Sequence, residues 1–154
     1  MGAVVAERDV EQFWHDGAIC LRGLFRDWIE PMRSAIEEVL EAPGPLAQNP
    51  ARPDYRPVGQ ERARSFHIEL GVWNRHPRFR AFALESPAVE IADRLLRSEQ
   101  VNLFFDQLFV KEPDSVEQRT PWHQDQAYWP IAGDQVVSVW VPFDPVSQEN
   151  GGLQ

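Results

Sequence analysis

The sequence has very little cysteine and no long hydrophobic run. Cys20 is the only cysteine among 154 residues, so no internal disulfide can form, and we expect a reducing compartment, the cytoplasm. Its apolar neighbours predict that Cys20 is a small buried residue. No apolar run approaches about 18 residues, so neither a membrane-spanning helix nor a membrane partner is predicted. The N-terminus lacks basic residues ahead of an apolar core and does not resemble a signal peptide.

Basic residues are also scarce. There are 15 Lys and Arg against 24 Asp and Glu, which gives a formal net charge of −9, and Lys111 is the only lysine. Nucleic-acid binding depends on a basic surface, so this balance argues against a nucleic-acid partner. The length is enough for one domain with a hydrophobic core, and we expect a single domain over residues 1–154.

The first hundred residues predict a mainly helical region. Apolar side chains recur at helical spacing in four segments, residues 7–15, 27–41, 77–84 and 87–97. Asp27 and Ser86 are the predicted N-caps, and Gly17 is expected to end the first helix. The remaining patterns predict a strand, a proline-rich loop, and a strand leading into a short helix, over residues 18–24, 43–59 and 64–73.

Beyond residue 101 the patterns are those of strands. Residues 102–111 and 136–143 are strand-like, and turns are predicted at 112–115 and 149–152. Helices first and strands later predict an α+β fold. We therefore expect residues 101–154 to contain the first core strands and the motif described next.

The segment 120–130 holds the triplet His123-Gln124-Asp125 between aromatic residues. Side chains two apart on an extended backbone point to the same face, which leaves Gln124 on the opposite one. One imidazole and one carboxylate on one face are two of the three ligands of a 2-His-1-carboxylate iron site, although Zn(II) also binds such groups. The alternative is a surface His and Asp on a loop.

The order of strand, triplet, strand and Glu-Asn-Gly-Gly turn resembles the phytanoyl-CoA dioxygenase family of iron- and 2-oxoglutarate-dependent oxygenases. The resemblance covers residues 102–153, with a weaker likeness at 10–14 and 16–18. It implies a double-stranded β-helix, a cupin-like jelly roll, with the N-terminal helices packed on one side.

The resemblance also implies an activity. Fe(II) held by His123 and Asp125, with 2-oxoglutarate as cosubstrate, would hydroxylate an aliphatic C–H of a small-molecule or acyl substrate. These two residues are accordingly the expected catalytic and metal-binding residues. Related halogenases lack the carboxylate, so the presence of Asp125 favours hydroxylation over halogenation.

Two further residues match cosubstrate positions of the family, and a third shares a strand face with one of them. Trp140 matches a tryptophan that lines the 2-oxoglutarate pocket, and Gln107 matches a position facing the cosubstrate. Lys111 shares a strand face with Gln107 by the period of two and can meet an anion. The alternatives are a core tryptophan and a solvated lysine at a strand end. His67 falls near a basic cosubstrate contact of some members, or is an ordinary half-buried histidine.

The family's distal iron histidine and its 2-oxoglutarate arginine belong to the C-terminal half of the barrel. The resemblance therefore implies a truncated chain, or a fragment, that is inactive as it stands. The alternative function is a non-catalytic jelly-roll remnant that acts as a binding module. A third reading, a tryptophan-rich carbohydrate-binding sandwich, does not need His123 and Asp125 on one face.

Overall fold

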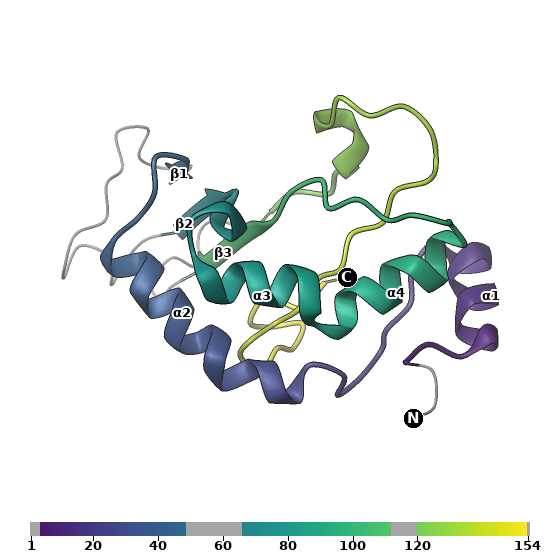
Figure 1. The fold of residues 1–154 in the computed structure, drawn as a ribbon, viewed down its shortest axis with the longest axis horizontal. Coiled ribbons are helices and arrows are strands. Elements are labelled where there is room, and N and C mark those ends of the chain that lie inside the picture. The colour runs from purple at the N-terminus through teal and green to yellow at the C-terminus, as the bar shows by residue number, and fades with distance from the viewer. Residues whose placement is uncertain (1–3, 49–65, 112–119, 154) are drawn as a thin grey trace.

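The computed structural model describes residues 4–48, 66–111 and 120–153 (Figure 1). Its longer helices are α1 (Glu7–Asp16), α2 (Ile29–Glu41), α3 (Pro77–Glu85) and α4 (Pro87–Leu96). Short 3-10 turns are η1 (Arg26–Trp28), η3 (Val72–Asn74) and η4 (Asp125–Tyr128). In this part of the chain, no helix is long and apolar enough to cross a membrane.

The predicted helices are confirmed, and local signals explain most of their ends. Gly17, at φ 77°, ends α1 in the left-handed region that favours glycine. Ser86 begins α4, and its hydroxyl accepts a hydrogen bond from the Ala88 N–H at 3.3 Å. The prediction that Asp27 caps α2 is wrong, because Asp27 lies inside η1 and this 3-10 turn leads directly into the helix.

The strands form one small antiparallel sheet in the order β1-β2-β3, with β1 (Ala47–Gln48), β2 (Phe66–Leu70) and β3 (Gln107–Lys111). The register pairs His67 with Val110 and Glu69 with Leu108, so these four side chains share one face. Leu108 and Val110 pack against α2 and α3, so this face is the one covered by helices. The segment 64–73 was predicted as a strand leading into a short helix, and β2 and η3 confirm this over the described residues.

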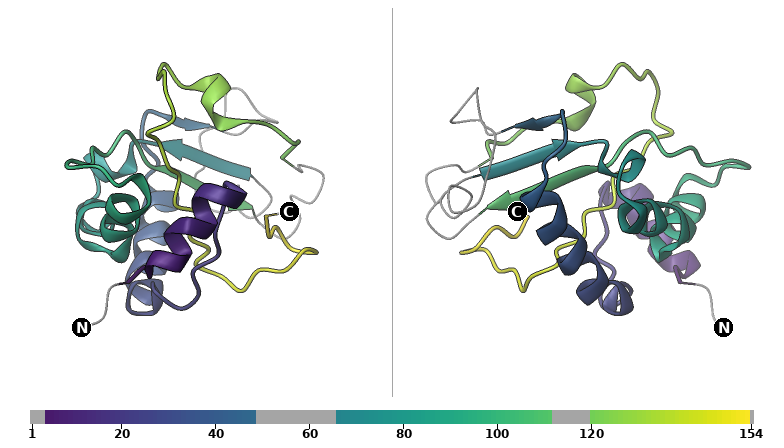
Figure 2. Two further views of the ribbon diagram at one scale, coloured as in Figure 1. Left: turned by 90° about the vertical axis from the view of Figure 1, so that its right-hand side faces the viewer. Right: turned by 60° about the vertical axis from the view of Figure 1, so that its left-hand side comes forward.

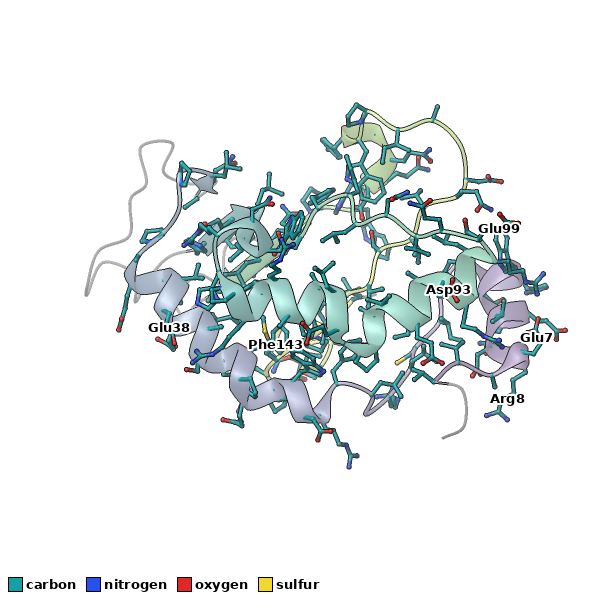
Figure 3. The ribbon with its side chains drawn as sticks, in the orientation of Figure 1. Glu7, Arg8, Glu38, Asp93, Glu99 and Phe143 are labelled. Atoms are coloured by element: carbon teal, nitrogen blue, oxygen red, sulfur yellow. The ribbon has the colours of Figure 1, made fainter. Side chains whose placement is uncertain are left out.

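Two hydrophobic clusters make up the core. The first lies between α2, α3 and the sheet and contains Met32, Ala35, Val39, Val72, Phe79 and Leu108. The second joins α1 to α4 and contains Val5, Val10, Ile91 and Leu95. Residues 136–144 reach both clusters. Val137 packs on the second, and Phe143 packs on the first (Figure 3).

The predicted strand over residues 18–24 is not formed, and Cys20 is exposed rather than buried. Ile19 and Leu21 both pack against the second core cluster. Alternate side chains of an extended chain face opposite ways, so burying Ile19 and Leu21 turns Cys20 toward solvent. The sequence correctly predicted an apolar segment. It placed Cys20 on the buried side of that segment, which Ile19 and Leu21 occupy instead.

Two other predicted strands are shorter or absent. Only Gln107–Lys111 of the predicted strand 102–111 is in the sheet, and residues 136–143 form no strand. A strand needs a neighbouring backbone to pair with, and among the described residues no strand pairs with 136–143. Helices and one small sheet agree with an α+β class, whereas the jelly roll remains a prediction. The predicted turn 112–115 and most of the predicted loop 43–59 lie outside the described residues.

Candidate metal centre

His123 and Asp125 are brought together by the backbone of the residue between them. Gln124 is extended, with φ −111° and ψ 127°, and Asp125 then begins η4. His123 Nε2 lies 3.1 Å from Asp125 Oδ1. The imidazole is 37% exposed and the carboxylate 51%, so the pair is open to a ligand from solvent. The structure thus gives the two side chains the common face that the sequence predicts.

The other nitrogen of His123 has its own partner. Nδ1 lies 2.8 Å from the Pro121 carbonyl oxygen, which can only accept a hydrogen bond, so Nδ1 carries a proton. Nε2 then faces the Asp125 carboxylate at 3.1 Å. Backbone carbonyls commonly orient metal-binding histidines in this way.

The two donor atoms are close enough to act together. The 3.1 Å between Nε2 and Oδ1 is the distance of an imidazole–carboxylate hydrogen bond. Imidazole and carboxylate suit Fe(II) and also Zn(II), so the pair fits a divalent cation of this kind.

Asp125 also meets a residue that the sequence did not single out. Its second oxygen, Oδ2, lies 3.5 Å from the Ser138 hydroxyl. Ser138 is two residues before Trp140, and both side chains are exposed. The period of two that was applied to the triplet also predicts that Ser138 and Trp140 share a face.

The segment around the triplet is held on both sides by residues from β3 and the chain before it. Lys111 Nζ lies 3.3 Å from the Thr120 hydroxyl, at the start of the segment. Beyond η4, the Trp129 ring lies 6.3 Å from that of Phe104 and 6.0 Å from that of Phe105. In both views of Figure 2, η4 lies near the top and α2 near the bottom, with the strands between them.

The predicted cosubstrate residues occupy two exposed surfaces. Gln107 and Lys111 lie on the face of β3 turned away from the helices, as the period of two predicts. The Lys111 ammonium lies 4.7 Å from the centre of the Phe66 ring, and partial burial lowers the pKa of Lys111. Trp140 is 45% exposed, which disfavours the core-tryptophan alternative.

His67 lies on the covered face of the sheet and is 1% exposed. Its Nε2 is 3.3 Å from Oε2 of Glu69, whose Oε1 accepts hydrogen bonds from Arg75 at 2.7 Å and from the Gly44 N–H at 3.1 Å. Burial acts to raise the pKa of Glu69, but hydrogen bonds from His67 and Arg75 outweigh it, so the pKa is lowered. This environment supports the reading of His67 as a core histidine.

Asp106 immediately precedes β3 and was missed by the sequence interpretation. Its Oδ2 accepts a hydrogen bond from the Trp73 N–H at 2.9 Å, and its carbonyl accepts one from the Gly71 N–H at 3.1 Å. Burial raises the pKa of this carboxyl despite the hydrogen bond from Trp73. These bonds join β3 to the turn after β2 and thereby set where Gln107 begins the strand.

In residues 4–48, 66–111 and 120–153, no group of three or more His, Cys, Asp or Glu side chains is placed to hold one ion. The centre built by the described residues is therefore the pair His123 and Asp125, with Ser138 beside it.

Comparison with known proteins gives one match. A family model described as phytanoyl-CoA dioxygenase matches residues 13–154. The matched range includes α2, the sheet, the triplet and the segment that contains Ser138 and Trp140. No curated protein and no solved structure matches the chain significantly.

Proposed function

Because the chain belongs to the phytanoyl-CoA dioxygenase family of iron- and 2-oxoglutarate-dependent oxygenases, we propose that it is a hydroxylase of this kind. Its substrate would be a small molecule or acyl compound with an aliphatic C–H. The observation that supports the proposal best is the pair of His123 Nε2 and Asp125 Oδ1, 3.1 Å apart on one exposed face. We further propose one domain over residues 1–154, whose strands belong to a jelly roll.

In this proposal His123 and Asp125 would hold Fe(II), and the Pro121 carbonyl, which lies 2.8 Å from Nδ1, would keep the imidazole oriented with Nε2 toward Asp125. Bound iron and 2-oxoglutarate supply the redox chemistry, in which dioxygen is consumed and the keto acid is decarboxylated. The protein's own contribution is to place the donor atoms and to orient both substrates.

Gln107, Lys111 and Trp140 are proposed to contact 2-oxoglutarate. The amide and the ammonium group are hydrogen-bond donors suited to a carboxylate, and both lie on the exposed face of β3. The bond between Lys111 and Thr120 brings the end of that strand to the segment that contains His123. Trp140 offers an exposed indole on the segment beside Asp125.

The test of this function is the variant Asp125→Ala. In a form of the protein that turns over 2-oxoglutarate, loss of this ligand should abolish release of CO2. It should also lower Fe(II) affinity by more than the roughly 10–100-fold that an outer hydrogen-bond partner contributes. Asp134→Ala is a matched control, because Asp134 is an exposed acid in the same loop region. Wild-type turnover by Asp125→Ala would remove Asp125 from the site. Absence of iron binding in the unmodified protein would favour the binding-module alternative.

A further inference from the structure

Residues 136–144 are held at two points although they form no strand. Near one end, Val137 packs against the second core cluster. Near the other, the Phe143 ring lies 5.5 Å from the ring of Phe82 on α3. Arg33 on α2 donates from Nε to the Phe143 carbonyl at 2.8 Å and from Nη2 to Asp144 Oδ1 at 3.0 Å.

Ser138 directly follows the first of these points. Val137 is half-buried against the second core cluster, whereas the next residue, Ser138, is exposed. The Ser138 hydroxyl lies 3.5 Å from Asp125 Oδ2. Figure 2 shows the segment after η4 descending past the strands toward α2, which fits the contact at one end and the Arg33 bonds at the other.

The two oxygens of Asp125 therefore face different partners. Oδ1 faces His123 Nε2 at 3.1 Å, and Oδ2 faces the Ser138 hydroxyl. The terminal torsion of an aspartate is broad, so a half-exposed carboxylate rotates easily unless its second oxygen is also bound. A hydroxyl that donates to Oδ2 restricts this rotation and keeps Oδ1 turned toward the imidazole.

We propose that Ser138 is a positioning residue, which orients the Asp125 carboxylate for metal binding. The inference rests on the proposed function, in which Asp125 is a ligand. The 3.5 Å distance is longer than the usual O–H···O hydrogen bond. Hydrogen bonds in such sites are often long before the ligand binds and shorten in the complex. The neighbouring Val137 packs against the second core cluster and so anchors the chain beside Ser138.

The test is a titration of the full chain with Co(II), followed by its visible absorption. Ser138→Ala should lower Co(II) affinity by about tenfold, the lower end of the effect of an outer hydrogen-bond partner. Ser138→Thr retains the hydroxyl and should restore affinity to within about twofold of the unmodified protein. Ser98→Ala is the matched control, because the Ser98 hydroxyl bonds only within its own turn, to the Gln100 carbonyl. It should leave the affinity unchanged.

The outcomes separate the inference from the function on which it rests. If the unmodified protein binds Co(II) and Ser138→Ala binds it equally well, the role of Ser138 is wrong and the metal site stands. If Ser138→Ala binds Co(II) less tightly and Ser138→Thr does not restore the affinity, the loss comes from a general packing effect and not from the hydrogen bond. The inference is then also wrong. If the unmodified protein does not bind Co(II), the proposed metal site fails, and the role of Ser138 fails with it.

Discussion

Glu69 shows how one side chain both stabilises this fold and makes it sensitive to acid. The carboxylate is 1% exposed and is held by Arg75, His67 and the Gly44 N–H. Its pKa is lowered from 4.5, because the hydrogen bonds of the charged form outweigh the effect of burial. A carboxyl with a depressed folded-state pKa adds stability above its unfolded-state pKa. That contribution is lost as the pH falls through the folded-state value.

We therefore predict that Glu69→Gln lowers the free energy of unfolding at pH 7 by about 1.5–3 kcal/mol, the range for hydrogen bonds to charged groups. Below the ordinary glutamate value of 4.5 the difference from the unmodified protein should shrink, because Glu69 of the unfolded chain takes up a proton before Glu69 of the folded chain does. Urea unfolding at pH 7 and pH 3.5 measures both effects. Glu41→Gln, at an exposed position at the end of α2, is the control. An equal loss at both pH values would contradict a role for the charge.

Trp140→Ala should raise KM for 2-oxoglutarate more than KM for the prime substrate. The reason is that Trp140 is exposed and only two residues from Ser138, whose hydroxyl lies 3.5 Å from Asp125 Oδ2. Trp14→Ala is a matched control, since Trp14 is 44% exposed against 45% for Trp140, but Trp14 packs at the junction of α1 and α4. Steady-state kinetics that show unchanged KM values and only a loss of stability would favour a packing role.

Among the elements, the segment 136–144 depends most on contacts far away in the sequence. It has no neighbouring strand among the described residues, and Arg33 on α2 binds its far end through Phe143 and Asp144. Figure 3 shows Phe143 between α2 and α3. A helix of the N-terminal region thus helps to place residues beside the candidate metal centre.

Arg33→Met should loosen this segment. Loss of the bond to the Phe143 carbonyl removes about 1 kcal/mol, and the exposed pair with Asp144 adds little. Cleavage after Trp140 and Phe143 by chymotrypsin should therefore become roughly fivefold faster. Limited proteolysis with fragment masses measures the effect. Glu30→Gln is the control, because Glu30 forms an exposed ion pair with Arg33, and such pairs contribute little to stability. Cleavage at the same rate in all three proteins would mean that Val137 and Phe143 hold the segment without Arg33.

On the scale of the whole molecule, exposed aromatic side chains favour association between copies, and the acidic net charge opposes it. Trp122 is 83% exposed and Tyr128 77%, and both flank the metal pair. The net charge of −9 keeps copies apart at neutral pH, and this repulsion vanishes near the pI of about 4.9. Uncovered aromatic side chains then favour association.

We predict that the protein self-associates with rising concentration and does so more strongly at pH 5 than at pH 8. Light scattering at several concentrations gives the mass at each pH. Trp122→Ser should reduce the association, whereas Val146→Ser, at a 41% exposed position away from the triplet, should not. A single monomer mass under all these conditions would show that this aromatic surface does not associate.

The sequence by itself determined the features whose causes lie within a few residues. Gly17 and Ser86 mark helix ends because a left-handed glycine and a capping hydroxyl act on the adjacent turn. The meeting of His123 and Asp125 is equally local, because one extended residue between them gives both side chains a common face. The resemblance to the family, which the match over residues 13–154 confirms, likewise rested on the order of short segments.

Only the tertiary structure decided which segments pair and which side chains are buried. Residues 136–143 have a strand-like sequence, yet a strand also requires a partner backbone, and Arg33 and the core hold this segment instead. Cys20 faces solvent because its two neighbours along the chain pack on α1 and α4. The contact between Ser138 and Asp125 depends on the same packing. Burial and pairing are set by residues distant in the chain, and the pattern of a single segment does not contain them.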